Sequence, residues 1–349
     1  MADIFLPEHS GWLLAPPLRG SRIGEADPRG VTKEVIETTD SLHQPPSLSL
    51  PLEGGGESKL RASRSMQQAF VEAACVLRRA GIETPELDAR LLICHAAGLT
   101  HEAYIARARD ELAPEVAARL GASIERRVQR EPVSRIIGSR EFYGRSFLVN
   151  PHALDPRPDT ESLIEAALGL VESSFWRERP LKLLDLGTGT GCILITLLAE
   201  LPQARGVGTD ISGAALALAA ANARRLGVAG RASFLAADWL DAIGTEFDLI
   251  LANPPYLASG EIALLSREVA SFDPRLALDG GPDGLDAYRR IAARAGEVLA
   301  QGGRLLVEIG ATQADSVAGI LRGAGLKVDA DQGIRPDLGG RPRSVVAGV

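Results

Sequence analysis

The sequence predicts an α/β protein whose doubly wound sheet has helices on both faces. From about Ser162 onward, apolar runs typical of strands alternate with helical stretches. A glycine-rich turn joins the first of these strands to a helix that opens at Ile193. The composition, 45% hydrophobic and 24% charged, is that of an ordinary globular protein. The predicted strands cover residues 181–186, 205–209, 232–237, 247–252, 304–309, 326–330 and 344–347.

Length and charge narrow the class of protein further. The 349 residues suggest about two domains, and the formal net charge of −7 argues against a broad, non-specific nucleic-acid surface. No apolar run approaches the roughly 18 residues of a membrane-spanning helix, and the N-terminus shows no secretory signal. Cys75, Cys94 and Cys192 are too scattered for a disulfide framework or a zinc site. We therefore expect a cytoplasmic protein without a metal centre.

The first 62 residues differ from the rest of the chain. They hold 7 of the 21 prolines and lack periodic apolar positions, so they cannot bury enough surface to offset the entropy of ordering. We expect a flexible extension over residues 1–62. Met66, the only internal methionine, stands where a helical pattern begins. An alternative is therefore that translation naturally starts at Met66 and that residues upstream of it are an artefact of the assigned start site. A targeting role is the rival, although transit peptides avoid the acids found here.

Residues 63–136 are predicted to form a small helical domain. Ser65 and Gln68 have the spacing of a capping box, and Gly81 is placed to end the first helix. A second helix, with leucines at positions 87, 91 and 92, is expected between Thr84 and Gly98. A later helix has apolar residues at positions 117, 120, 124 and 128. This domain is either a packing appendage or a partner-recognition domain.

Two further segments complete the predicted organisation. Residues 137–156 are expected to form a linker that contains a β-hairpin turning at Gly144. Residues 157–349 contain the alternating strands and helices, so they form the α/β domain.

The first candidate site is the glycine-rich turn after the strand at 181–186. The turn has the spacing G-x-G-x-G, and position 192 is Cys, so the dinucleotide fingerprint G-x-G-x-x-G is not met. Glycines here let the backbone approach a ligand and turn into a helix N-terminus, although a tight structural turn would also explain them. The turn comprises Gly187, Thr188, Gly189, Thr190 and Gly191.

Acidic and aromatic residues follow the next two predicted strands. Asp210 ends the second strand, where a carboxylate can accept hydrogen bonds from both ribose hydroxyls. Asp238 and Trp239 follow the third strand, where the indole could stack on an adenine and the carboxylate could accept from its amino group. A partly buried core tryptophan is nearly as good an explanation of Trp239. Together with the glycine turn, Asp210 favours a nucleoside ligand.

The most informative motif is Asn253-Pro254-Pro255-Tyr256, directly after the apolar strand at 247–252. The two prolines force the chain out of the sheet at the edge where ligands bind in such folds. The Asn253 side-chain carbonyl and a proline carbonyl are neutral acceptors that can hold both protons of a planar amino group, while Tyr256 can stack on it. The motif therefore favours an amide or a base amine as substrate.

Taken together, these motifs resemble S-adenosylmethionine-dependent amino-group methyltransferases. Upstream, Arg130-Glu131-Pro132 and the stretches 138–144 and 156–161 are similar to the HemK/PrmC family, which methylates the glutamine of the Gly-Gly-Gln motif in class-1 peptide-chain release factors. The resemblance covers about residues 66–349. Asp155 stands where that family has an aliphatic residue, and Asp273-Pro274 where it has Glu-Pro.

The resemblance implies a fold, a cofactor and residue roles. The fold would be a Rossmann-like S-adenosylmethionine methyltransferase sheet with seven strands, the last antiparallel. The glycine turn, Asp210, Trp239 and Asn253 would contact the cofactor, with Asp238 as an addition. Residues 253–256 would hold the substrate amide, with Asn253, Pro254 and Tyr256 as catalytic residues.

We have further expectations for three side chains of the 156–161 stretch, for the oligomeric state and for the binding partners. Arg157, Asp159 and Glu161 would line the lip of the site, although a structural capping role suits Asp159 equally well. We expect a monomer with a release-factor substrate and no nucleic-acid binding. The alternatives are glutamine methylation of a ribosomal protein and adenine N6-methylation of nucleic acid.

Overall fold

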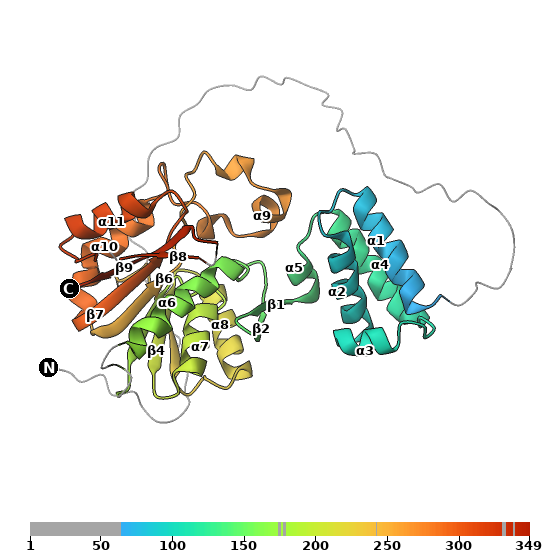
Figure 1. Ribbon diagram of the computed structural model, residues 1–349, viewed down its shortest axis with the longest axis horizontal. Helices are drawn as coiled ribbons and strands as arrows, with labels where there is room; N and C mark the ends of the chain where they lie inside the picture. Colours follow the sequence, from blue (N-terminus) through green and yellow to red (C-terminus); the bar gives the residue numbers. More distant parts are fainter. Residues whose placement is uncertain (1–63, 174–175, 177–178, 242, 330–332, 338) are drawn as a thin grey trace, which may run out of the picture. The chain divides into compact units, whose positions relative to one another are not determined.

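The computed structural model describes residues 64–173, 176, 179–241, 243–329, 333–337 and 339–349 (Figure 1). The predicted extension at 1–62 lies outside these residues. Residues from Met66 to Ile137 are helical, as the sequence predicted. The helices are α1 (Met66–Arg79), α2 (Pro85–Ala97), α3 (His101–Ala106), α4 (Pro114–Val128) and α5 (Val133–Ile137).

Local capping explains where the first helices begin and end. Ser65 and Gln68 form the predicted capping box, in which each side chain bonds the backbone N–H of the other residue. Gly81 and Gly98 follow α1 and α2 with φ of +69° and +66°, a conformation that favours glycine. Pro85 opens α2 at its first turn, as predicted.

The apolar positions of α2 are divided between its two faces. Leu92 and Ile93 are fully buried in the helical core. In contrast, Leu87 and Leu91 are 43% and 41% exposed, because Ala89 and Ala96 share the inward face with Leu92. The three leucines therefore do not form one buried stripe.

The predicted hairpin is confirmed. Strands β1 (Ser139–Phe142) and β2 (Arg145–Leu148) pair antiparallel around a two-residue turn. The turn residues Tyr143 and Gly144 have φ of +49° and +69°, the geometry of a type I′ turn, whose twist matches the flanking strands.

The main sheet has seven strands in the order β5-β4-β3-β6-β7-β9-β8. Strands β3 to β7 are parallel, and β9 runs antiparallel to its neighbours β7 and β8. The expected seven-stranded sheet with an antiparallel last strand is thus confirmed. The strands are β3 (Lys182–Leu186), β4 (Arg205–Asp210), β5 (Ala232–Ala236), β6 (Phe247–Ala252), β7 (Leu299–Glu308), β8 (Ile334–Pro336) and β9 (Pro342–Gly348).

One predicted strand is wrong. Of the segment 326–330, residues 326–329 are described, and they contribute only an isolated bridge between Lys327 and Gly348. The edge strand of the sheet is β8 instead, which pairs with β9 from Ile334 onward. The apolar residues that suggested a strand have another explanation: Leu326 is buried against α11 (Ala314–Gly323) and its neighbours in the core.

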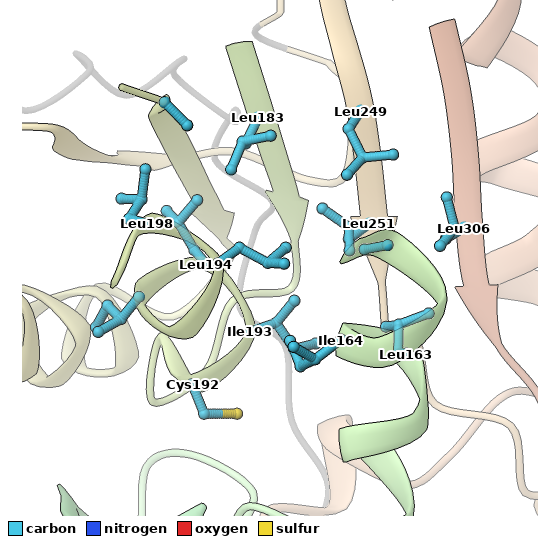
Figure 2. Packing of buried hydrophobic residues seen from close by; sticks show 14 of the residues in the cluster. Leu163, Ile164, Leu183, Cys192, Ile193, Leu194, Leu198, Leu249, Leu251 and Leu306 are labelled. Carbon is cyan, nitrogen blue, oxygen red and sulfur yellow. The ribbon is translucent and has the colours of Figure 1, made fainter. Parts of the chain in front are cut away.

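Helices cover both faces of the sheet. Helices α6 (Glu161–Glu172), α7 (Cys192–Glu200) and α8 (Gly213–Arg225) lie on one face, and α10 (Asp286–Val298) and α11 lie on the other (Figure 1). Figure 2 shows Leu163 and Ile164 of α6 meeting Leu251 and Leu306 of the strands, all fully buried or nearly so. Because successive strand residues point to opposite faces, the neighbouring residues of β6 form the second core with α10 and α11.

Candidate functional site

The carboxyl ends of the parallel strands border a cavity of about 870 Å³, within the range of small-molecule sites. Its walls come from the glycine turn after β3, the ends of β4, β5 and β6, and two loops. One loop precedes η1 (Pro158–Thr160), and the other contains η4 (Arg275–Ala277). The lining includes Gly187, Thr188, Gly189, Thr190, Asp210, Asp238, Trp239, Asn253 and Pro255, together with His152, Arg157, Thr160, Leu276 and Arg290.

The three glycines of the turn have different tasks. All have positive φ, of +66°, +56° and +80° for Gly187, Gly189 and Gly191. A Cβ on Gly187 would lie 3.5 Å from the Trp239 ring, inside the cavity wall. A Cβ on Gly191 would lie 2.7 Å from Ile195 Cδ1, so this glycine lets α7 pack closely and does not line the cavity.

A buried carboxyl supports the turn from below. Asp185, at the end of β3, is fully buried, and its Oδ2 accepts a hydrogen bond of 2.6 Å from the Thr188 hydroxyl. Its Oδ1 has no hydrogen-bond partner in the described part of the chain. Burial raises the pKa of Asp185 to about 7, although the bond from Thr188 opposes that shift.

Asp210 stands at the predicted place, with its carboxylate already oriented. Its Oδ2 accepts from the Gly189 backbone at 3.0 Å and its Oδ1 from the Ser212 backbone at 2.8 Å. Each carboxylate oxygen has a second lone pair, so both can still accept from a ribose hydroxyl. The backbone bonds thus aim the carboxylate at the cavity.

Trp239, which follows β5, contacts both the cavity and the hydrophobic core. It lines the cavity and also packs against the core cluster that includes α10, so it serves as a cavity wall and as a core residue at once. Its φ of +53° is unusual for a residue other than glycine and fits a functional wall position. Asp238 lines the cavity too, but it forms an ion pair of 2.6 Å with Arg290 that holds it toward α10.

The four residues after β6 are not equivalent. Asn253 and Pro255 line the cavity. Pro254 is buried, and Tyr256 packs against the core while its carbonyl accepts from Gln313 at 2.9 Å, so neither side chain belongs to the cavity wall. Burial raises the pKa of Tyr256, which stays neutral near pH 7. The Asn253 Nδ2 donates to the Thr160 hydroxyl at 3.0 Å, which leaves Oδ1 as the end available to a ligand.

Only one of the three expected lip residues lines the cavity. Arg157 does so, and its guanidinium pairs with Asp273 at 2.5 Å. Asp159 pairs with Arg343 at 2.9 Å, and Glu161 accepts from the Tyr143 backbone at 2.9 Å. These two side chains therefore have structural partners.

Asp155 and Asp273, the two residues that depart from the family pattern, lie close together in the structure because both contact Arg135. The side chain of Arg135 in α5 is 3% exposed, and its guanidinium lies 2.9 Å from Asp273 and 3.2 Å from Asp155. Asp155 also accepts from the Ser134 hydroxyl, and the guanidinium donates to two backbone carbonyls of the linker. Asp155 and Asp273 thus share Arg135 as a buried partner, and Asp273 also pairs with Arg157.

A second set of ion pairs joins α4 to the loop beyond the cavity. Arg127 pairs with Asp88 at 2.7 Å and with Glu268 at 3.3 Å, and Arg130 lies 3.4 Å from Glu268. Glu268 belongs to α9 (Arg267–Phe272), just before Asp273. The helical domain is therefore tied to the loop that borders the site.

Sequence reasoning missed several residues of this region. Thr160 was inside a recognised motif but had no assigned role, and Glu308 at the end of β7 was not singled out. An acid directly after an apolar strand, the signal used for Asp210, was present at Glu308 too. His152 also borders the cavity, on its exposed rim. In the described part of the chain, no group of three or more metal-binding side chains occurs, and no helix is long and apolar enough to span a bilayer.

Comparison with known proteins agrees with the fold. The PrmC N-terminal domain model matches residues 68–138, and the Methyltransferase small domain model matches residues 170–280. A release factor glutamine methyltransferase of Cereibacter sphaeroides is 48% identical, covering 82% of this chain and 98% of the relative. That of Rhodospirillum rubrum is 46% identical, covering 84% and 88%, and that of Bradyrhizobium diazoefficiens is 46% identical, covering 81% and 95%.

The sheet order, the matched methyltransferase domain and the relatives therefore place the chain among the S-adenosylmethionine-dependent methyltransferases. Within that class, the chain belongs to the release factor glutamine methyltransferase family.

Proposed function

We propose that this enzyme methylates the side-chain amide nitrogen of the glutamine in the Gly-Gly-Gln motif of class-1 release factors. The observation that carries the proposal is the position of Asn253, which presents a neutral acceptor to the cavity that the glycine turn also borders. Family membership supports the same substrate. Neutral acceptors suit a carboxamide, which has two N–H donors and no negative charge.

The residues of the glycine turn fit the cofactor. Gly187 and Gly189 leave backbone space that a Cβ would fill, and Trp239 borders that space. We propose that the turn from Gly187 to Gly191 and Asp210 hold S-adenosylmethionine, with Trp239 against the adenine. Asp238 lines the cavity while its Oδ2 is paired with Arg290, which leaves Oδ1 to accept from the adenine amino group.

The chemistry needs little beyond alignment. When bound, S-adenosylmethionine supplies an electrophilic methyl group on a sulfonium. The lone pair of a glutamine amide nitrogen is delocalised, so it is a poor nucleophile. Asn253 Oδ1 and a neighbouring proline carbonyl accept its two N–H bonds, which orients the nitrogen and stabilises the positive charge that develops on it. The glycine turn and Asp210 would hold S-adenosylmethionine so that its methyl group could pass to this nitrogen, with S-adenosylhomocysteine as the leaving group and the amide proton lost to solvent.

The remaining parts of the chain support a protein substrate. We propose that residues 63–136 recognise the release factor, since their ion pairs with Glu268 connect them to the loop at the cavity. Residues 137–156 serve as the linker and 157–349 as the methyltransferase domain. The enzyme acts as a cytoplasmic monomer that does not bind nucleic acid, consistent with its net charge of −7.

One assay compares the candidate substrates. The purified protein is given cofactor labelled in its methyl group together with a release factor, large-subunit ribosomal proteins, or nucleic acid. We expect label on the release factor only, at the Gly-Gly-Gln glutamine, and none when that glutamine is replaced by alanine. Label on ribosomal protein or on adenine, with none on the release factor, would refute the proposal.

A further inference from the structure

Asn253 can do its proposed work only with one end of its carboxamide toward the substrate. The two ends of a carboxamide have nearly the same shape, but only Oδ1 can accept the N–H bonds of a substrate amide. A rotation of 180° would present Nδ2 instead and repel those N–H groups. Something in the structure must therefore distinguish the two ends.

The contact between Asn253 and Thr160 does not suffice by itself. Thr160 Oγ1 lies 3.0 Å from Asn253 Nδ2, and only 2% of the threonine is exposed. A hydroxyl can accept from an amide nitrogen or donate to an amide oxygen, so Thr160 alone would tolerate either orientation.

Glu308 removes this ambiguity. Its carboxyl, 1% exposed, lies within hydrogen-bonding reach of the Thr160 side chain, which opposes the rise of the pKa of Glu308. A carboxylate only accepts, so it takes the single hydroxyl proton of Thr160. The hydroxyl oxygen is then left to accept, and its partner must be Asn253 Nδ2.

The sheet places Glu308 where this chain of bonds can form. Ala252 of β6 is in register with Val307 of β7, so Asn253 and Glu308 follow on adjacent strands at the same edge. Glu308 does not line the cavity, and its Oε2 has no hydrogen-bond partner among the described residues. A buried carboxyl with an unsatisfied oxygen costs stability, and packing alone gives no reason to keep it.

We propose that Thr160 and Glu308 are positioning residues: the chain of hydrogen bonds from Asn253 Nδ2 through the Thr160 hydroxyl to the Glu308 carboxylate holds Asn253 Oδ1 toward the acceptor amide. This inference rests on the proposed role of Asn253. Neither positioning residue touches the reacting atoms.

The arrangement depends on the charge of Glu308. Burial raises the pKa of Glu308 to about 7, opposed by the bond from Thr160 and by Arg343. A protonated carboxyl can donate to Thr160, which frees the threonine proton for Asn253 Oδ1 and permits the wrong orientation. The other titratable groups facing Glu308 are Asp159 at η1, Tyr256 after β6, Tyr288 on α10 and Cys192 on α7.

Kinetics test the proposal first. Thr160→Val removes the hydroxyl at nearly constant shape, and we expect kcat for release-factor methylation to fall about tenfold or more, as loss of one charge-assisted bond predicts. KM for the release factor and affinity for S-adenosylmethionine should stay within about twofold. Thr160→Ser should restore kcat. Equal rates for the valine and serine variants would overturn the proposal.

A matched control is available in α7. Thr196 is fully buried and its hydroxyl has no hydrogen-bond partner in the described part of the chain. Thr196→Val should therefore leave kcat unchanged. If it lowers kcat as much as Thr160→Val does, the loss reflects general damage to the fold and the proposal fails.

Spectra test the proposal without a substrate. The side-chain amide of Asn253 is observed in ¹⁵N-labelled protein and assigned from its absence in Asn253→Asp. We expect its signals to shift with a midpoint near pH 7 in the native protein and to lose that transition in Glu308→Gln. A transition that persists in Glu308→Gln, or is absent from the native protein, would contradict the proposed chain of hydrogen bonds from Asn253 to Glu308. A protein that shows the transition yet labels no release factor would instead refute the proposed function alone.

Discussion

Replacing Arg135 with methionine tests the buried ion cluster of the linker. The change removes a guanidinium that contacts Asp155 and Asp273, both almost fully buried. Breaking a buried ion pair by removing one partner typically costs about 3–5 kcal/mol. Asp273 keeps Arg157 and Asp155 keeps the Ser134 hydroxyl, so we expect a loss near the lower end, about 3 kcal/mol.

The assay is urea unfolding followed by tryptophan fluorescence, at pH 8 and at pH 5. Burial already raises the pKa of Asp273, and without Arg135 that pKa rises further, so protonation of Asp273 at low pH relieves the buried charge. The deficit should therefore be smaller at pH 5 than at pH 8. Adding Asp155→Val to the Arg135→Met variant should recover part of the loss, because it removes a carboxylate left without its main partner.

A surface pair supplies the control. Arg126 pairs with Glu131 at 2.6 Å, but about half of the arginine side chain is exposed. Arg126→Met should cost less than about 1 kcal/mol, as for most exposed ion pairs. The reasoning would be refuted if Arg135→Met cost no more than this control, or if its deficit were equal at both pH values.

Four further predictions concern the site. Asp210→Ala should weaken S-adenosylmethionine binding about tenfold or more, since it removes a charged acceptor for the ribose; calorimetric titration with unchanged affinity would remove that assignment. Asn253→Ala should abolish most turnover while cofactor affinity falls less, and near-normal methylation by this variant would contradict the amide-holding role. Gly187→Ala should lower thermal stability, because φ of +66° strains a residue with a Cβ, and should weaken cofactor binding, because that Cβ would occupy space in the cavity wall; an unchanged dissociation constant would argue against a ligand there. Glu308 has a folded-state pKa of about 7, above its ordinary value, so it stabilises the fold at low pH and that contribution is lost as pH rises toward 7. Glu308→Gln should therefore gain roughly 3 kcal/mol relative to the native protein between about pH 4.5 and 7; parallel stability curves for the two proteins would show that the carboxyl is not perturbed.

The parts of the fold that the sequence predicted are those governed by local rules. The capping box at Ser65, the glycine ends of α1 and α2, and the hairpin turn at Gly144 each depend on residues a few positions apart. The apolar run at 247–252 became β6 with the predicted bounds, because all six residues are buried between the two helical layers. Local chemistry determined these elements, so one sequence was enough to find them.

The parts that could not be predicted depend on distant partners. Thr160 and Asn253 are 93 residues apart, and Arg135 and Asp273 are 138 apart, so no local pattern relates them. Asp155 looked like an isolated departure from the family until Arg135 was seen beside it. The edge strand was misplaced for the same reason, because pairing with β9 decides which residues after α11 become a strand.

The position of β9 in the sheet has a consequence for how the chain folds during synthesis. β9 follows β8 in the sequence, but it lies between β7 and β8 in the sheet. During synthesis β8 therefore emerges before the strand that joins it to the sheet, and β7 keeps an open edge that could pair with other chains. Closure of that edge must wait for β9, so a chain that stopped before β9 would leave both β7 and β8 without their pairing partner.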